Sequence, residues 1–221
     1  MTARQADFLN MDLSRKVVIE TESMEWQGSR ADHVLRKPLE REYSEAGRAT
    51  SIVEFLPGAS FPAHRHDLGE EIFVLEGVFS DEKGDYPAGT YLRNPPGSMH
   101  SPHSKKGCKL FVKLEQFDPE DQSKVVINTL KTPWQSGIGH LQVMGLHSFK
   151  TEHTALVLWP EGEKFQPHHH WGGEEILVLQ GEFIDEHGHY PKGTWIRSPH
   201  LSLHDPWVEE ETLIWVKTGH L

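Results

Sequence analysis

Two histidines that are one residue apart, His64 and His66, are followed by Glu70 and, further along the chain, by His100. Successive side chains of an extended strand point to opposite faces, so His64 and His66 share one face while Arg65 points away from it. Imidazole nitrogens and carboxylate oxygens are ligands of divalent transition metals. The residue types and their spacing therefore predict a metal site.

The turn residues before Glu70 and His100 explain how these two can join the histidine pair. Gly69 permits a tight reversal that returns the Glu70 carboxylate to the same face. The run Pro95-Pro96-Gly97 predicts a turn that brings the strand carrying His100 back beside it. Four ligands then converge from separate segments. No catalytic residue can be assigned from the sequence.

The same pattern occurs a second time. Residues 70–77, Glu-Glu-Ile-Phe-Val-Leu-Glu-Gly, match residues 174–181, Glu-Glu-Ile-Leu-Val-Leu-Gln-Gly, at an offset of 104. A single His-x-His pair is weak evidence for a metal, whereas the repetition of a whole ligand set at one offset is strong evidence. Leu201 replaces the glycine found at position 97, so the ligand geometry of the second half is less firmly predicted. The second ligand set is His168, His170, Glu174 and His204.

Short runs rich in β-branched and aromatic residues, such as 51–56, 71–75 and 154–159, indicate an all-β fold. Residues 80–84 and 184–188 have the composition of hairpin turns. Trp26 and Trp134 mark where the duplicated unit is expected to begin. We expect an N-terminal extension over 1–23, a first domain over 24–118 and a second over 119–221, each a small barrel or sandwich.

Composition excludes several classes of function. The formal net charge of −11 repels phosphate backbones, which argues against nucleic-acid binding. One cysteine, Cys108, cannot form an intrachain disulfide, which fits a reducing compartment. No stretch approaches the length of apolar sequence that crosses a membrane. We therefore expect a soluble, cytoplasmic protein without a membrane partner.

Both halves resemble the cupin superfamily, whose motifs are G-x5-H-x-H-x3-E-x6-G and G-x5-P-x-G-x2-H-x3-N. The closing Asn of the second motif is replaced by Ser104 in the first half and by Val208 in the second. The resemblance implies two tandem cupin barrels, which are double-stranded β-helices of the jelly-roll type. The first half fills the motifs with Gly58, His64, His66, Glu70, Gly77, Gly89, Pro95, Gly97 and His100.

Residues 69–82, 93–98 and 107–108 further resemble the cupin-like domain of the anti-sigma factor ChrR. In that family the equivalent residues bind zinc, which implies one divalent metal per barrel with zinc favoured. Iron, nickel and manganese stay open because the same ligands suit them. A separate zinc-binding N-terminal domain captures the sigma factor in ChrR. Only about 20 residues precede the first repeat here, so sigma-factor binding is not carried over.

The resemblance favours a metal-binding regulatory or sensor-type bicupin without the zinc-binding anti-sigma domain. The alternative is a non-haem, metal-dependent dioxygenase acting on a small diketone or aromatic ketone, because three imidazoles and one carboxylate leave coordination positions open. Whether the chain is an enzyme is left undecided, and a storage-type role ranks last. The expected partner is a small-molecule ligand or substrate, and both a monomer and a homodimer are compatible with the sequence.

Residues beside the ligands have two interpretations. Phe61, Phe165, Tyr91 and Trp195 either line a substrate pocket or pack in the core, and core packing is favoured. Glu71 and Glu175 fall on the opposite strand face from the ligands. We expect these two glutamates at the surface or in a supporting role.

Overall fold

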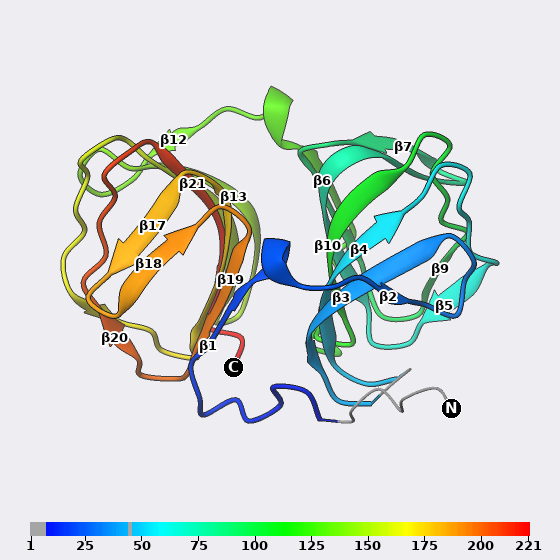
Figure 1. Ribbon diagram of the computed structural model, residues 1–221, viewed down its shortest axis with the longest axis horizontal. Coiled ribbons are helices and arrows are strands. Elements are labelled where there is room, and N and C mark those ends of the chain that lie inside the picture. Colours follow the sequence, from blue (N-terminus) through cyan, green and yellow to red (C-terminus); the bar gives the residue numbers. More distant parts are fainter. Residues whose placement is uncertain (1–7, 44–45) are drawn as a thin grey trace. The chain divides into compact units, whose positions relative to one another are not determined.

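The computed structural model describes residues 8–43 and 46–221 and is built of antiparallel strands (Figure 1). Its described residues contain no α-helix, only two 3-10 turns, η1 (Thr21–Ser23) and η2 (Thr129–Lys131). No helix in this part of the chain has the length and apolarity needed to span a membrane. The expected all-β fold of two tandem cupin barrels is confirmed.

The chain divides into two compact units. Of the described residues, unit 1 comprises 8–11 and those within 25–132, and unit 2 comprises Asp12–Met24 and Pro133–Leu221. Each unit holds one large antiparallel sheet and smaller two-stranded pairings.

Unit 1 is built on one large sheet with the strand order β11-β8-β6-β10-β4-β3-β2. Strand β7 pairs with the far end of β6, and β5 pairs with β9 as a separate ladder. The strand bounds are β2 (Gln27–Gly28), β3 (Val34–Arg41), β4 (Ala49–Phe55), β5 (His64–His66), β6 (Glu70–Asp81), β7 (Gly84–Pro87), β8 (Thr90–Asn94), β9 (Ser98–His100), β10 (Cys108–Leu114) and β11 (Val125–Asn128).

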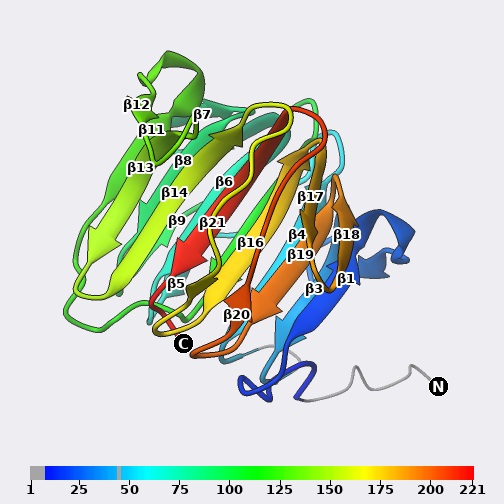
Figure 2. The same cartoon turned by 90° about the vertical axis from the view of Figure 1, so that its left-hand side faces the viewer.

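Unit 2 repeats this plan, with the order β1-β19-β16-β21-β14-β13-β12 and the pairs β15-β20 and β17-β18. Figure 2 shows the strands of its large sheet side by side. The bounds are β1 (Val17–Glu20), β12 (Gln135–Ser136), β13 (Gln142–Phe149), β14 (Glu152–Trp159), β15 (His168–His169), β16 (Glu174–Gln180), β17 (Glu182–Asp185), β18 (Gly188–Pro191), β19 (Thr194–Ser198), β20 (Leu203–His204) and β21 (Thr212–Thr218).

Alternation along the strands explains where each core lies. In unit 1, Ser51, Val53 and Phe55 occupy alternate positions of β4 and face the barrel interior. Apolar residues from β6, β8 and β10 complete a buried cluster around Ile72 and Leu110. A matching cluster in unit 2 surrounds Trp159 with residues of β16, β19 and β21. Each barrel therefore has its own hydrophobic core.

The two predicted hairpin turns are present. Asp81 pairs with Gly84 where β6 meets β7, and Asp185 pairs with Gly188 where β17 meets β18. Each hairpin has a two-residue loop, for which aspartate and glycine are favoured flanking residues.

The unit boundaries differ from the domain limits that we expected. Strand β1 lies in the segment expected to be an extension, yet it pairs with β19 of unit 2. Strand β11 lies in the segment expected to open the second domain, yet it pairs with β8 of unit 1. Because Val17-Val-Ile-Glu and Val125-Val-Ile-Asn are alike, the duplication begins upstream of the two tryptophans.

Candidate metal centres

The first candidate centre lies where the short ladder β5-β9 meets the start of β6. His64 and His100 are cross-strand partners in that ladder. The Nε2 atoms of His66 and His100 are 2.9 Å apart. The Oε2 atom of Glu70 is 3.5 Å from His66 Nε2 and 3.4 Å from His100 Nε2. The ligand atoms of the three histidines all lie within 4.8 Å of one another, and Glu70 lies against two of them.

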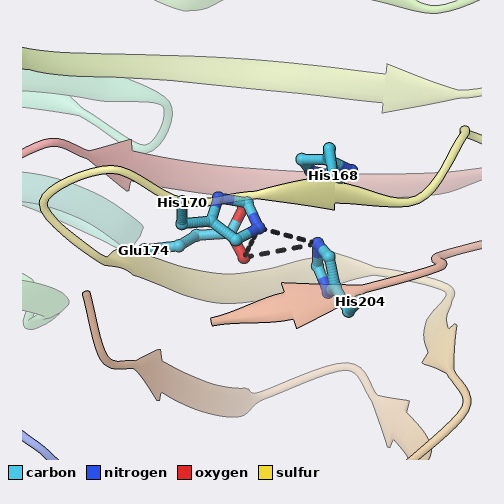
Figure 3. Close-up of side chains that lie close together, drawn as sticks. All are labelled: His168, His170, Glu174 and His204. Carbon is cyan, nitrogen blue, oxygen red and sulfur yellow. Dashed lines mark hydrogen bonds and ion pairs between the residues drawn. The ribbon is translucent and has the colours of Figure 1, made fainter. Parts of the chain in front are cut away.

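The second candidate centre repeats this arrangement in unit 2 (Figure 3). His168 and His204 are cross-strand partners of the β15-β20 ladder. The Nε2 atoms of His170 and His204 are 3.0 Å apart, and Glu174 Oε2 is 3.4 Å from the first and 3.7 Å from the second. All four residues offer a ligand atom within 4.8 Å of the others. The structure thus brings together the second predicted set.

Leu201 takes the backbone conformation that glycine supplies in the first unit. Its φ is +63°, and the φ of Gly97 at the equivalent place is +82°. A leucine in the left-handed region is disfavoured by contact of its Cβ with the backbone. The turn before His204 therefore forms without its glycine, at a cost in backbone strain.

The spacing of the donor atoms fits a divalent metal. Imidazole nitrogens bound at right angles to one ion, each about 2.1 Å from it, lie about 3 Å apart. The His66–His100 and His170–His204 separations of 2.9 and 3.0 Å match this distance. Glu174 Oε2 is buried and has no hydrogen-bond donor in the described part of the chain, as expected of a carboxylate oxygen that serves a cation. Nitrogen and carboxylate donors together suit first-row transition metals.

Hydrogen bonds on the far side of each ring fix its orientation. The Nδ1 atoms of His64 and His168 are each 2.9 Å from a backbone carbonyl, of Pro62 and Gln166 respectively. When Nδ1 carries the proton and donates it to the carbonyl, Nε2 keeps a lone pair for the metal. Both rings are therefore held in the form that binds a metal.

An aspartate lies beside the last histidine of each ligand set. His100 Nδ1 lies 3.7 Å from Asp81 Oδ2, and His204 Nδ1 lies 3.6 Å from Asp185 Oδ2. Tyrosine hydroxyls donate hydrogen bonds to the other oxygen of each aspartate, at 3.1 Å from Tyr86 and 2.8 Å from Tyr190. The sequence interpretation missed these groups. Their recurrence at the 104-residue offset was the signal that could have found them.

Burial sets the protonation of the ligands. It lowers the pKa of His66, and with the neighbouring His204 and His168 it lowers the pKa of His170 to about 3. Both rings are thus neutral, which is the form that coordinates a metal. Burial also raises the pKa of Glu174 to about 7. A carboxylate is disfavoured in this environment unless a cation compensates its charge.

Each centre opens into a cavity. The cavity in unit 1 has a volume of 420 Å³ and is bounded by His64, His66 and Glu70. The cavity in unit 2 has a volume of 370 Å³ and is bounded by its complete ligand set. Both volumes fall in the range typical of small-molecule sites, about 300 to 1,000 Å³.

The aromatic residues divide between the two expected roles. Phe61 and Phe165 line the cavities. Tyr91 donates a hydrogen bond of 2.5 Å to Glu71, and the indole nitrogen of Trp195 donates one of 2.8 Å to Glu175.

The glutamates that follow Glu70 and Glu174 are not surface groups. Glu71 and Glu175 are only 3% and 0% exposed. Arg93 lies 3.5 Å from Glu71, and His220 lies 3.1 Å from Glu175. Each carboxylate is therefore part of a buried polar cluster on the sheet face that points away from the metal ligands.

A jelly-roll barrel repeated twice, each with three histidines and a glutamate beside an internal cavity, defines a bicupin. The family model for the ChrR cupin-like domain matches residues 14–118 and again 122–221. The chain therefore belongs to the ChrR cupin-like family, in which it carries two copies of the domain.

Solved structures agree with this fold. A candidate dioxygenase from Nostoc punctiforme superposes with a TM-score of 0.79 at 15% identity, over 94% of this chain and 84% of that one. Protein Ylba from E. coli superposes with a TM-score of 0.72 at 13% identity, over 94% of this chain and 92% of that one. A mutant of oxalate decarboxylase OxdC from Bacillus subtilis superposes with a TM-score of 0.62 at 14% identity, over 91% of this chain and 76% of that one. No curated protein matches the sequence.

Proposed function

We propose that each barrel binds one divalent transition metal through three histidines and one glutamate, and that the metal binds a small molecule in the adjoining cavity. The observation that carries this proposal is that His64, His66 and Glu70 of unit 1 and all four ligands of unit 2 lie on the wall of a cavity. A purely structural metal site is closed by protein ligands, whereas a site that binds further ligands keeps a position open. The metal, when bound, supplies a Lewis acid at the base of each cavity.

The biological role that fits best is regulatory or sensor-like. The resemblance to the cupin-like domain of the anti-sigma factor ChrR supports it, as does the match of the ChrR cupin-like domain to both halves of the chain. In this role, occupancy of the cavity changes the state of the barrel, and the chain's own residues need only bind and orient the ligand. Zinc is the metal that the family resemblance favours, and the cytoplasm is the compartment we expect.

Cobalt substitution tests this function, because the visible spectrum of Co²⁺ reports its coordination. Azide should change the spectrum of the cobalt protein saturably, since it can occupy an open position. A spectrum that azide leaves unchanged at both sites would show that protein ligands close them, and the proposal would fail.

A metal-dependent dioxygenase is the second candidate. Apolar side chains such as Trp159, Phe165 and Val157 surround the ligands of unit 2, which suits a small diketone or aromatic ketone. The fold that the chain shares with the Nostoc candidate dioxygenase is compatible with this reading. Oxygen uptake by the iron-loaded protein with a panel of such ketones discriminates it from the sensor role. If none of the ketones causes oxygen uptake, dioxygenase activity on those substrates is excluded.

A further inference from the structure

The two cavities differ in charge although their ligand sets are alike. The wall in unit 1 carries four arginines, Arg30, Arg36, Arg41 and Arg65, against the carboxylates of Asp67, Glu70 and Glu115. Arg65 forms an ion pair of 2.9 Å with Asp67 at the exposed rim. Among the described residues, the only Asp, Glu, Lys or Arg that lines the cavity of unit 2 is the ligand Glu174.

The strand register shows that one arginine has an apolar counterpart. Arg36 of β3 lies opposite Val53 of β4, and Val143 of β13 lies opposite Val157 of β14. Val53 and Val157 are one repeat apart, so Arg36 and Val143 occupy the same place. Both line their cavities.

A second arginine is replaced in the same way. The backbone N–H of Ser29 donates to Val34, and that of Gly137 donates to Leu141, which closes an equivalent turn in each unit. The residues that follow directly, Arg30 and Ile138, both line the cavity of their unit.

A third arginine, Arg41, is 4% exposed and also lines the cavity of unit 1. Its cross-strand partner is Ala49, and the corresponding position in unit 2 is Ser148, opposite His153. At this position too, unit 1 carries a charged residue where unit 2 carries an uncharged one.

We infer that unit 1 takes a small carboxylate ligand, whose anionic group is bound by the arginines of β3 and the preceding turn, and that unit 2 takes a neutral, apolar ligand. Guanidinium groups bind carboxylates through paired, charge-assisted hydrogen bonds. A carboxylate in the cavity of unit 2 would lose its hydration without gaining such partners. The inference rests on the proposed function, because it specifies the ligand class of the same metal sites.

Two probes of nearly equal shape test the inference. Benzoylformate and 1-phenylpropane-1,2-dione both offer adjacent oxygens to a metal, but only the first carries a carboxylate. Full-length protein with His170→Ala and His204→Ala retains the site in unit 1, and protein with His66→Ala and His100→Ala retains the site in unit 2. Each is loaded with Co²⁺ and titrated with each probe by visible absorption.

Unit 1 should bind benzoylformate about tenfold or more tightly than the dione, and unit 2 should show the reverse order, because a hydrogen bond to a charged group contributes at least that factor. In unit 1, the double variant Arg30→Ile with Arg36→Val should lower the affinity for benzoylformate about tenfold and change the affinity for the dione about twofold or less. The reciprocal Ile138→Arg with Val143→Arg should increase benzoylformate binding in unit 2.

Two results would overturn the inference in different ways. If both units prefer the same probe, or if the arginine exchanges leave the preference unchanged, the assigned ligand classes are wrong. The proposed function would still stand in that case, provided that azide changes the cobalt spectrum. If the cobalt proteins respond neither to azide nor to either probe, the proposed function and this inference both fail.

Discussion

Lys16, which precedes β1, forms an ion pair of 3.1 Å with Asp185, although 169 residues separate them in the sequence. Lys16 also donates a hydrogen bond of 2.9 Å to the Tyr190 hydroxyl. Because Asp185 supports the metal ligand His204, the N-terminal strand of unit 2 is connected to its candidate metal centre. The equivalent residue before β11 is Lys124, which is exposed.

Replacing the supporting aspartate should weaken the second metal site. Asp185→Asn removes the charge that orients His204 and increases its basicity as a ligand, and losses of this kind typically cost about 10- to 100-fold in metal affinity. Competition with a coloured chelator measures the effect. Asp81→Asn is the matched change in unit 1, and each variant should weaken only its own site. An equal loss at both sites would mean that the aspartates act through global stability.

Replacing Lys16 should instead strengthen metal binding at the second site. In Lys16→Met, Asp185 is still held by Tyr190 and by the backbone N–H of His187, so its position persists while a nearby positive charge disappears. The second site should therefore bind metal about two- to fivefold more tightly, as expected for a partly exposed ion pair. Lys124→Met serves as the control and should change neither site. Weaker binding in Lys16→Met would show that the lysine positions the aspartate.

The second site should show a pH dependence that belongs to Glu174. Burial raises the pKa of Glu174 from 4.5 to about 7 in the metal-free protein. Below about pH 7 a metal must displace this proton, so metal affinity should fall about tenfold per pH unit from this group alone. Chelator competition between about pH 5.5 and 8 measures the slope. Glu174→Gln should reduce the slope by one proton, and an unchanged slope would contradict the assignment.

The same shift affects the stability of the metal-free protein. The folded state keeps the Glu174 proton that the unfolded state loses between pH 4.5 and about 7. Its contribution to stability is therefore fully present below pH 4.5 and is lost as the pH rises through about 7. Bound metal should consequently increase the melting temperature more at high pH than at low pH.

Leu201 provides a test of backbone strain beside a ligand. Its φ of +63° is tolerated by glycine without contact of a Cβ. Leu201→Gly should therefore increase the free energy of unfolding by about 0.5 to 1 kcal/mol, which is the relief of strain less the entropy of a freer unfolded chain. Gly97→Ala at φ +82° should cost about 1 kcal/mol. Chemical denaturation measures both, and a destabilising Leu201→Gly would mean that the leucine side chain contributes packing.

The ligand sets and the repeated barrels could be predicted from sequence because they depend on local rules. Alternation along a strand places His64 and His66 on one face, and glycine-containing turns return Glu70 and His100 to it. Because the domain is duplicated, each of these patterns occurs twice in the sequence. The hairpins at Gly84 and Gly188 follow from the same local preferences.

The features that escaped prediction depend on partners distant in sequence. The four residues of β1 would present the same alternating pattern whichever sheet they joined, so pairing with β19 could not be read from them. Asp185 of β17 supports His204 of β20, and this contact depends on how the two strands are placed beside each other. The charge contrast between Arg36 and Val143 became visible only when the strand register placed both on cavity walls.

The metal content of the purified protein tests the central claim most directly. Protein prepared without a metal-affinity column should carry close to two equivalents of divalent metal per chain by elemental analysis, since each barrel offers its own ligand set. His64→Ala or Glu70→Ala should each reduce this to about one equivalent by emptying the first site. A chain that holds no metal, or variants that keep the full content, would contradict the assignment of these residues as metal ligands.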